Sequence, residues 1–348
     1  MRCPRLSDLP PPPPDKQGWP WTEESQRLSD PVRPSTPWPR LTVITPSFNQ
    51  GHFLEATIRS VLLQGYPDLE YMILDAASTD NSVDIIKKYA PWLSYWVSEP
   101  DGGQSAAINR GLKIGTGLLA SWINSDDLFC QNALIQHATR IGFCSDIVYV
   151  GDCLYIDGAG QIRERHRGRV HSFPDLLDIR NVWRAHGHIV QPEVLFPRQL
   201  ALSVGGLNTT DHFTMDYELW GKLFLVGVQF QYTEIPFGMF RRHQAQKTRD
   251  KWKITQSLVA AAIRLVLQAD DYSEATRQAL LTELRTYQDE YWKRTGPLAC
   301  CGLPPAVVQH LRRLRYRLHL RTRIWDILAW FCRRDRHAQA SSIKTLSP

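Results

Sequence analysis

Short apolar runs alternate with amphipathic stretches along the chain after residue 40. Three apolar runs have the length and composition of buried strands: 41–46, 69–75 and 95–98. Helices are predicted after them: over 53–64, where apolar residues recur at roughly the helical period, over 83–89, which follows turn and N-cap residues, and from 105 to 112. In 120–129 a further apolar run ends at polar residues before the chain turns apolar again, and a helix is predicted to follow over 131–141. This order of strand, loop and helix predicts an α/β fold, in which a mixed, mostly parallel Rossmann-type sheet is flanked by helices.

The pattern continues after residue 141 and loosens after Asp175. A strand is predicted over 146–155, and a hairpin turn follows it at 157–160. Between 175 and 215, apolar islands alternate with polar loops, as expected where a scaffold builds a binding site. The basic segment 237–248 is predicted to be a loop. Three further helices are predicted: 211–226, 258–267 and 272–292.

The two ends of the chain differ from its centre. Residues 1–40 are rich in proline, which cannot form regular backbone hydrogen bonds, so an extended arm is predicted. Trp19 and Trp21 flank a proline in this arm, which leaves two alternatives, an arm packed on the globular body or a disordered leader. Four regions are therefore predicted: a Pro-rich arm at 1–40, the α/β domain at 41–250, a helical extension at 251–305 and a basic tail at 306–348.

Positive charge is concentrated in the C-terminal tail. The formal net charge is +6, and residues 310–336 hold nine arginines against two aspartates. The rest of the chain is therefore close to neutral, and we expect no nucleic-acid partner. Arginines interleaved with leucine, tryptophan and phenylalanine are typical of an amphipathic helix at an anionic lipid surface, and equally of a terminal helix packed on the protein. Both alternatives stay open.

Targeting features are few. The seven cysteines form no CxxC pair, which argues against a disulfide framework and for a reducing compartment. The first residues lack the pattern of a signal peptide, and no apolar run approaches the roughly 18 to 20 residues that span a bilayer. We expect a cytoplasmic location, with peripheral contact at the inner face of the membrane if 310–336 binds lipid.

The segment Asn124–Asp127 carries the most informative chemistry. One apolar run ends there and another begins directly after it, which is how a buried strand delivers acidic side chains to the carboxyl edge of a sheet. Two adjacent carboxylates beside apolar residues need a cationic partner, so Asp126 and Asp127 favour a divalent metal that bridges to a phosphate group. The alternative is a helix cap or a solvated pair on a loop.

Other predicted strand ends carry polar groups that suit a nucleotide. Pro46, Ser47 and Asn49 could line the floor of a binding site for a nucleotide base. Asp75 could accept a hydrogen bond from a ring N–H or a ribose hydroxyl. Asp101 precedes paired glycines, which let backbone N–H groups approach a ligand closely. Each of these features also has a structural explanation as a turn or a helix-capping acid.

Asp216 and His243 are candidates for a general base and a metal ligand. Asp216 opens the helical part of 211–226, where it either caps the helix or removes a proton from an attacking hydroxyl. His243 follows Arg241 and Arg242, where it ligates a metal, contacts phosphate or is simply solvated. The residues alone leave these alternatives open.

Taken together, these segments resemble the family 2 glycosyltransferases, inverting enzymes with the GT-A fold. The matching segments occur in the family's order over about residues 41 to 250: Thr45–Asn49, Leu74–Ser82, Glu99–Gln104 with Asn109 and Gly111, Asn124–Asp127, Asp216–Trp220 and Arg241–His243. The resemblance implies a metal ion at Asp126 and a catalytic base at Asp216. It also implies nucleotide contacts from Pro46, Asp75 and Asp101.

We therefore expect a metal-dependent glycosyltransferase. Asp216 is the expected base, and Asp126, Asp127 and His243 are the expected ligands of Mn²⁺ or Mg²⁺. Contacts with the nucleotide sugar are expected from a larger set: Pro46, Ser47, Asn49, Asp75, Asp101, Gln104, Asn124, Ser125 and Arg242. The resemblance implies transfer, with inversion, from a nucleotide-diphosphate donor (UDP-sugar favoured) to a hydroxyl of a glycan or lipid-linked acceptor, in surface polysaccharide or glycan synthesis.

Two departures from the family's pattern bear on function, and a third is mild. Asn124 stands where many members have the first aspartate of a DxD motif, which affects metal affinity or metal choice. Met215 replaces an acid that often precedes the base, and Ala76-Ala77 stands where glycine is frequent. The departures at Asn124 and Met215 keep a second class open, a catalytically degenerate nucleotide- or carbohydrate-binding protein of the same fold. A nucleotidyltransferase is a third alternative, but Ser47–Gly51 lacks the basic residues it would need.

Overall fold

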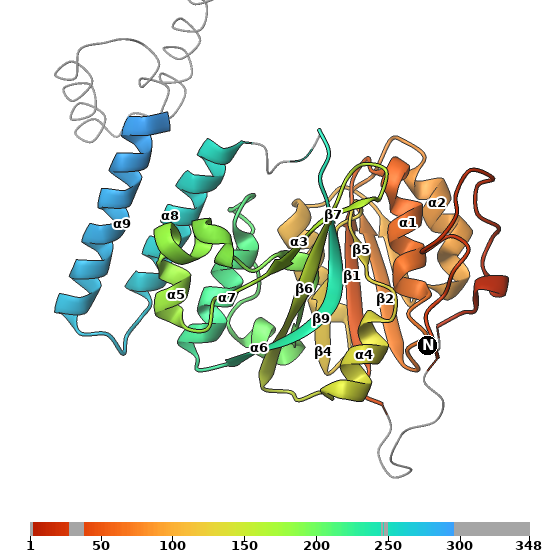
Figure 1. Cartoon of the computed structure of the whole chain (residues 1–348), viewed down its shortest axis with the longest axis horizontal. Helices are drawn as coiled ribbons and strands as arrows, with labels where there is room; N and C mark the ends of the chain where they lie inside the picture. Colours follow the sequence, from red (N-terminus) through yellow and green to blue (C-terminus); the bar gives the residue numbers. More distant parts are fainter. Residues whose placement is uncertain (1–2, 28–37, 245, 247–249, 296–348) are drawn as a thin grey trace, which may run out of the picture. The chain divides into compact units, whose positions relative to one another are not determined.

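The computed structural model describes residues 3–27, 38–244, 246 and 250–295. It divides the chain into two compact units, Met1–Arg249 and Asp250–Pro348. The described part of the first unit is built on a nine-stranded sheet (Figure 1). The basic tail at 306–348 lies outside the described residues, so both alternatives for 310–336 stay predictions.

The parallel half of the sheet follows the predicted order of strands and helices. It contains four strands: β1 (Leu41–Ser47), β2 (Leu69–Asp75), β3 (Tyr95–Ser98) and β4 (Leu119–Trp122). They lie in the order β3-β2-β1-β4, and each neighbouring pair is parallel. Helices separate them along the chain: α1 (Gly51–Leu62), α2 (Ser82–Tyr89) and α3 (Gln104–Ile114). The predicted α/β fold is confirmed.

Residues of β1 alternate between the two faces of the sheet, and this alternation sets the layers. Leu41 and Val43 share a buried cluster with Ile58 of α1. Ile44 faces α3, where a Cβ placed on Gly111 would come within 2.8 Å of it. Glycine at this position therefore lets α3 lie close against the sheet.

The other half of the sheet is mixed. It contains five strands: β5 (Leu128–Phe129), β6 (Ile147–Ile156), β7 (Ile162–Arg167), β8 (Val194–Pro197) and β9 (Gln229–Arg241). β8 pairs antiparallel with β4 and β6, β7 forms a hairpin with β6, and β9 runs parallel to β6 and antiparallel to β5. The prediction of a loop over 237–248 is wrong for its first residues, because β6 and β5 pair with β9 as far as Arg241.

Helical segments cover the loops around the sheet: η1 (Leu6–Asp8), η2 (Ala90–Trp92), α4 (Ala133–Arg140), α5 (Phe173–Leu177), η3 (Ile179–Gly187), η4 (Gln191–Glu193), α6 (Arg198–Ser203) and α7 (Met215–Leu225). Trp220 of α7 stacks on Trp122, with ring centroids 5.7 Å and planes 17° apart, and Phe196 packs edge-on against both. Because Trp122 ends β4 just before Asn124–Asp127, this aromatic cluster joins the base of that loop to α7.

The proline-rich arm packs on the sheet domain. Cys3 and Leu9 are buried in the main core cluster, and Trp19 Nε1 donates to the Phe129 carbonyl oxygen at 2.9 Å. Figure 1 shows the arm, in red, running beside α1 and α2. Of the two alternatives for the arm, packing holds for residues 3–27.

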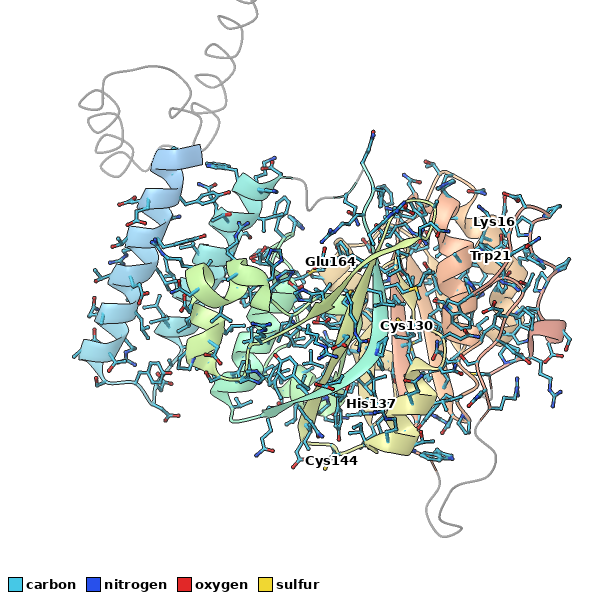
Figure 2. The ribbon with its side chains drawn as sticks, in the orientation of Figure 1. Lys16, Trp21, Cys130, His137, Cys144 and Glu164 are labelled. Carbon is cyan, nitrogen blue, oxygen red and sulfur yellow. The ribbon has the colours of Figure 1, made fainter. Side chains whose placement is uncertain are left out.

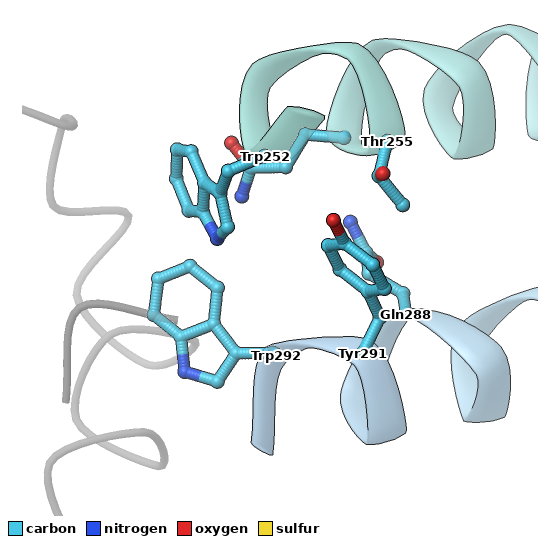
Figure 3. Close-up of a pocket in the computed structure, with 6 residues that line it drawn as sticks. Trp252, Thr255, Gln288, Tyr291 and Trp292 are labelled. Carbon is cyan, nitrogen blue, oxygen red and sulfur yellow. The ribbon is translucent and has the colours of Figure 1, made fainter. Parts of the chain in front are cut away.

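The second unit contains α8 (Lys251–Leu267) and α9 (Glu274–Thr295), which correspond to the two helices predicted there, although α8 begins seven residues before its predicted start. The rings of Trp252 and Trp292 lie with centroids 5.2 Å apart beside Tyr291 (Figure 3). This aromatic contact packs the two helices together. Within the described ranges, no helix has both the length and the apolar character needed to cross a membrane.

Candidate active site

Polar side chains gather at the carboxyl edge of the parallel strands. Ser47, Asp75 and Ser98 end β1, β2 and β3 and are register partners. The buried Asp75 carboxylate accepts hydrogen bonds from the Ser78 N–H at 2.9 Å, the Ser78 hydroxyl at 2.6 Å and the Ser98 hydroxyl at 2.7 Å. The Ser47 hydroxyl is buried and has no hydrogen-bond partner among the described residues. Open α/β sheets bind their ligands at this edge.

The loop after β1 is tied to the loop after β2. Asn49 has a left-handed backbone (φ 51°), its N–H donates to the Ser78 hydroxyl at 2.8 Å, and its side-chain oxygen accepts from the Thr79 N–H at 2.8 Å. Phe48, in the same loop, is 59% exposed. An exposed aromatic ring near the fixed Asp75 carboxylate offers a nucleoside both a stacking surface and a polar contact.

The two adjacent aspartates lie in different environments. Asp126 Oδ2 is 2.9 Å from His243 Nε2, and the two side chains are 14% and 11% exposed. Asp127 is fully buried, where Oδ1 accepts from the Arg241 N–H at 2.8 Å and Oδ2 accepts from the Asn124 amide at 3.2 Å. Burial raises the pKa of Asp127, and the neighbouring Asp126 carboxylate raises that pKa further. Asp126 and His243 thus form a partly exposed pair, the Asp126–His243 corner, and the buried Asp127 anchors the loop.

Arg241, the last residue of β9, holds this corner together. Besides the backbone bond to Asp127, its Nε donates to the Asp126 carbonyl oxygen at 2.8 Å. Its guanidinium lies 4.9 Å from the centroid of the Phe53 ring, and the His243 ring packs on the same phenylalanine at 4.8 Å. Sequence reasoning gave Arg241 no role, although a buried acidic pair signals the need for a cationic partner.

A chain of hydrogen bonds links the aspartate loop to the start of α3. The Gln104 amide donates to Asn124 Oδ1 at 2.7 Å, and the Asn124 amide donates to Asp127. Asp101 Oδ1 accepts from the Gly103 N–H at 2.7 Å, which shapes the turn before α3. Asn124 therefore both accepts and donates at this position, which an ionised aspartate could not do.

Asp216 lies in the first turn of α7, whose start packs against the start of α3. The Met215 sulfur is 2.7 Å from the Ser105 hydroxyl, so the head of α7 adjoins the turn that carries Gln104. Asp216 Oδ1 accepts from the Tyr217 N–H at 2.8 Å. Desolvation raises the pKa of Asp216 to about 6, although backbone hydrogen bonds oppose the rise. A carboxylate with this pKa at a ligand-binding edge suits a general base near neutral pH.

A row of aromatic and basic side chains connects the aspartate corner with α7. The Arg242 guanidinium lies 3.6 Å from the centroid of the Tyr155 ring, and the Tyr155 hydroxyl is 3.1 Å from His188 Nε2. Trp183 of η3 lies 6.0 Å from His188 and packs edge-on against Tyr217 at 4.7 Å, measured between ring centroids. Burial lowers the pKa of His188 to about 3, so its ring is neutral at pH 7. Sequence reasoning missed this row because its members come from separate segments without a shared pattern.

Most of the predicted site residues share one edge of the sheet. They lie at or after the carboxyl ends of β1 to β4, or after the end of β9: Pro46, Ser47, Asn49, Asp75, Asp101, Gln104, Asn124, Ser125, Asp126 and His243. Arg242 is directed elsewhere, toward Tyr155 and Glu164, whose Oε2 is 3.3 Å from the guanidinium. In the part of the chain that the structure covers, no three His, Cys, Asp or Glu side chains are grouped to hold a metal ion. The expectation that Asp127 is a third metal ligand, beside Asp126 and His243, stays a prediction.

Comparison with solved structures identifies the fold as that of the GT-A glycosyltransferases. The structure of S. aureus TarS 1–349 with UDP has a TM-score of 0.56 and 17% sequence identity, over 77% of this chain and 76% of that one. TarS 1–349 with UDP-GlcNAc gives the same score and identity over 74% of each chain. At this identity, the likeness establishes the fold alone.

Sequence comparison then gives the family. Residues 42–201 match the family described as glycosyl transferase family 2. Relatives include uncharacterized glycosyltransferases of Rickettsia typhi, 28% identical over 62% of this chain and 68% of that protein, and of Rickettsia prowazekii, 29% identical over 60% and 66%. One from Mycobacterium tuberculosis H37Rv is 38% identical over 103 residues, which are 29% of this chain and 39% of that protein. The chain thus spans about two thirds of the first two relatives and less of the third. The match to glycosyltransferase family 2 thus covers residues 42–201 of the chain.

Proposed function

We propose that this protein transfers a sugar from a nucleotide-diphosphate donor to a hydroxyl group, with inversion at the anomeric carbon. The observation that carries the proposal is the presence of three groups around one sheet edge. These are the fixed Asp75 carboxylate, the Asp126–His243 pair, and Asp216 with its raised pKa. A nucleoside, a diphosphate and an attacking hydroxyl require these three kinds of group.

The nucleoside would bind over the loops after β1 and β2. Asp75 supplies a fixed hydrogen-bond acceptor, and the exposed Phe48 ring supplies a stacking surface. The Asn49–Ser78 hydrogen bond keeps both loops in register. We favour a UDP-sugar, because the fold neighbour TarS has been crystallised with UDP and with UDP-GlcNAc.

The diphosphate would lie at the Asp126–His243 corner. A carboxylate and an imidazole that converge within 2.9 Å fit a divalent cation such as Mn²⁺ or Mg²⁺, with diphosphate oxygens as further ligands. When bound, the cation neutralises the negative charge that develops on the leaving diphosphate. Asp127 and Arg241 fix the loop that presents Asp126, so the carboxylate is already in place when the donor binds.

The acceptor would approach from the side of Asp216. As the acceptor oxygen bonds to the anomeric carbon, Asp216 takes the proton of that hydroxyl. The bond between the anomeric carbon and the diphosphate oxygen breaks, and its electron pair leaves with the diphosphate. Attack on the face opposite the leaving group inverts the configuration.

Trp183 lies on this side of the site, packed against Tyr217, and offers an apolar ring to a glycan or a lipid-linked sugar. The arrangement of η3 beside the candidate base therefore supports an acceptor built on a sugar. Membrane contact through 310–336 and work in surface polysaccharide synthesis stay predictions.

A panel of nucleotide sugars tests the proposal. The protein is incubated with each donor, Mn²⁺ and an excess of simple glycosides, and free nucleoside diphosphate is measured. We expect release from one donor class, and its loss in Asp216→Asn while nucleotide binding is retained. Nucleotide binding without release from any donor would instead support a degenerate binding protein, the class that Asn124 and Met215 keep open.

A further inference from the structure

The N-terminal arm lies outside the residues that match the family, yet it contacts the segment that carries the candidate metal ligand. We propose that the arm, residues 3–27, is a functional part of the catalytic domain. In this proposal Arg59 is a positioning residue that couples the arm, through α1, to the segment 125–134. The inference rests on the proposed function, in which Asp126 of that segment helps to bind the donor diphosphate.

Arg59 is fully buried, and backbone carbonyl groups of the arm surround its guanidinium. Nε donates to the Pro20 oxygen at 3.0 Å, one terminal nitrogen to the Pro10 oxygen at 2.9 Å, and the other to the Trp21 oxygen at 2.9 Å. The Tyr89 hydroxyl accepts a fourth hydrogen bond at 3.0 Å. Removal of this cation would leave several buried acceptors unpaired, so the arm would lose its anchor on α1.

Another face of α1 holds the aspartate segment. Residues two positions apart on a helix point about 200° apart, so Thr57 is directed away from Arg59. The buried Thr57 hydroxyl lies 3.0 Å from the Ser125 carbonyl oxygen and 2.7 Å from that of Asp127. These two residues flank Asp126, so Thr57 fixes the backbone on both sides of the candidate ligand.

Ser60 of α1 and Gln64, two residues beyond the end of this helix, continue the contact along the segment. The Ser60 hydroxyl accepts from the Phe129 N–H at 3.1 Å, and the Gln64 amide donates to the Cys130 carbonyl oxygen at 2.9 Å. Figure 2 shows Trp21 of the arm next to α1, and Cys130 farther into the sheet domain. The helix therefore lies between the arm and the aspartate segment and bonds to both.

The arm also contacts the aspartate segment directly. Four hydrogen bonds join them: Trp19 Nε1 to the Phe129 oxygen at 2.9 Å, the Gln131 amide to the Glu24 oxygen at 2.9 Å, the Asn132 N–H to the Ser25 hydroxyl at 2.9 Å, and the Gln26 N–H to Asn132 Oδ1 at 2.7 Å. The arm, α1 and 125–134 thus form one hydrogen-bonded assembly. Its effect on Asp126 is exerted through the backbone of the segment, which is why Arg59 is a positioning residue and not a catalytic one.

The chain offers a matched control for Arg59. Arg198 is also buried and also donates to backbone oxygens, those of Gly117 and Leu112, both at 2.9 Å. Gly117 precedes β4, at the edge of the sheet opposite to Asp126. Arg59→Met and Arg198→Met should therefore destabilise the fold in similar ways, while Arg59→Met alone should disturb the aspartate segment.

Two measurements on the full chain test the coupling. In the absence of nucleotide and metal, hydrogen exchange at the amides of 127–132 should be about tenfold faster in Arg59→Met than in the wild type, and unchanged in Arg198→Met. In calorimetric titrations of UDP with Mn²⁺, the Kd should rise about tenfold in Arg59→Met, because small displacements of a binding group are costly. Arg59→Lys, which keeps the charge, should recover part of this loss, and Arg198→Met should bind like the wild type.

Each outcome bears on a separate part of the inference. Wild-type exchange rates in Arg59→Met, or equal acceleration in Arg198→Met, would overturn the coupling. Faster exchange with an unchanged Kd would overturn its effect on the donor site. If Arg59→Met is too unstable to purify, Arg59→Lys is judged by the same criteria. A wild-type protein that binds neither UDP nor GDP would contradict the proposed function and the donor-site effect together, while hydrogen exchange would still decide the coupling.

Discussion

The proposed role of Asp216 makes a prediction about pH that follows from the desolvation of its side chain. Its pKa is raised to about 6, so about nine tenths of the molecules hold the carboxylate at pH 7 and about one tenth at pH 5. Because only the carboxylate can accept the proton of an acceptor hydroxyl, kcat/KM should fall about tenfold between these pH values. Below pH 5 the decline should approach one decade per pH unit.

The assay is release of nucleoside diphosphate from a bound nucleotide sugar at subsaturating donor, from pH 5 to pH 8. Circular dichroism at each pH confirms that the protein stays folded. Asp216→Asn keeps the size of the side chain and an oxygen for the Tyr217 N–H. It should lower turnover by about 10²- to 10⁴-fold and remove the inflection near pH 6. Wild-type turnover that stays level from pH 7 to pH 5, or an inflection that survives in Asp216→Asn, would refute the assignment of the base.

Three further predictions concern stability and the acceptor. His137 is buried, its ring nitrogens have no partner among the described residues, and burial lowers its pKa to about 4. The unfolded chain then binds a proton at His137 more tightly than the folded chain does, so the free energy of unfolding should fall by about 2 kcal/mol from pH 8 to pH 5. In urea denaturation, His137→Phe should lack this pH-dependent loss of stability. Asn124→Asp puts a carboxylate beside the buried Asp127 in place of a donor, so unfolding free energy should drop by about 1 to 3 kcal/mol; an unchanged urea midpoint would contradict this. Trp183→Ala should raise the acceptor KM by about tenfold and leave the donor KM unchanged, with Trp183→Phe between; equal changes in both constants would argue against an acceptor contact.

The parallel half of the fold could be predicted from the sequence because its strands end at clear signals. β2 stops at Asp75 before turn residues, and β3 stops just before Glu99-Pro100, so both observed ranges agree with the predicted ones. The end of β9 could not be predicted in this way. Pro236 and Gly238 lower its local strand propensity, and the strand exists because β6 pairs with it across register shifts near Asp152.

The same division applies to the site. The placement of Asp75, Asp101 and Asp126 could be predicted because each ends or follows a predicted strand, which fixes the edge of the sheet where it lies. Asp216 opens a helix, so this argument does not place it. That the Asp126 side chain is partly exposed while the Asp127 side chain is buried could not be predicted. This difference in burial depends on Arg241, which lies 114 residues after Asp127 in the chain, and on contacts of the segment with α1. Such long-range contacts leave no periodic pattern in the sequence.

The most direct test of the central claim is a calorimetric titration of UDP and GDP into the purified protein, with and without Mn²⁺. We predict that one nucleotide binds at least about tenfold more tightly with the metal, and that Asp126→Ala loses this gain. Equal binding with and without Mn²⁺, or a gain that persists in Asp126→Ala, would contradict the assignment of the diphosphate to the Asp126–His243 corner.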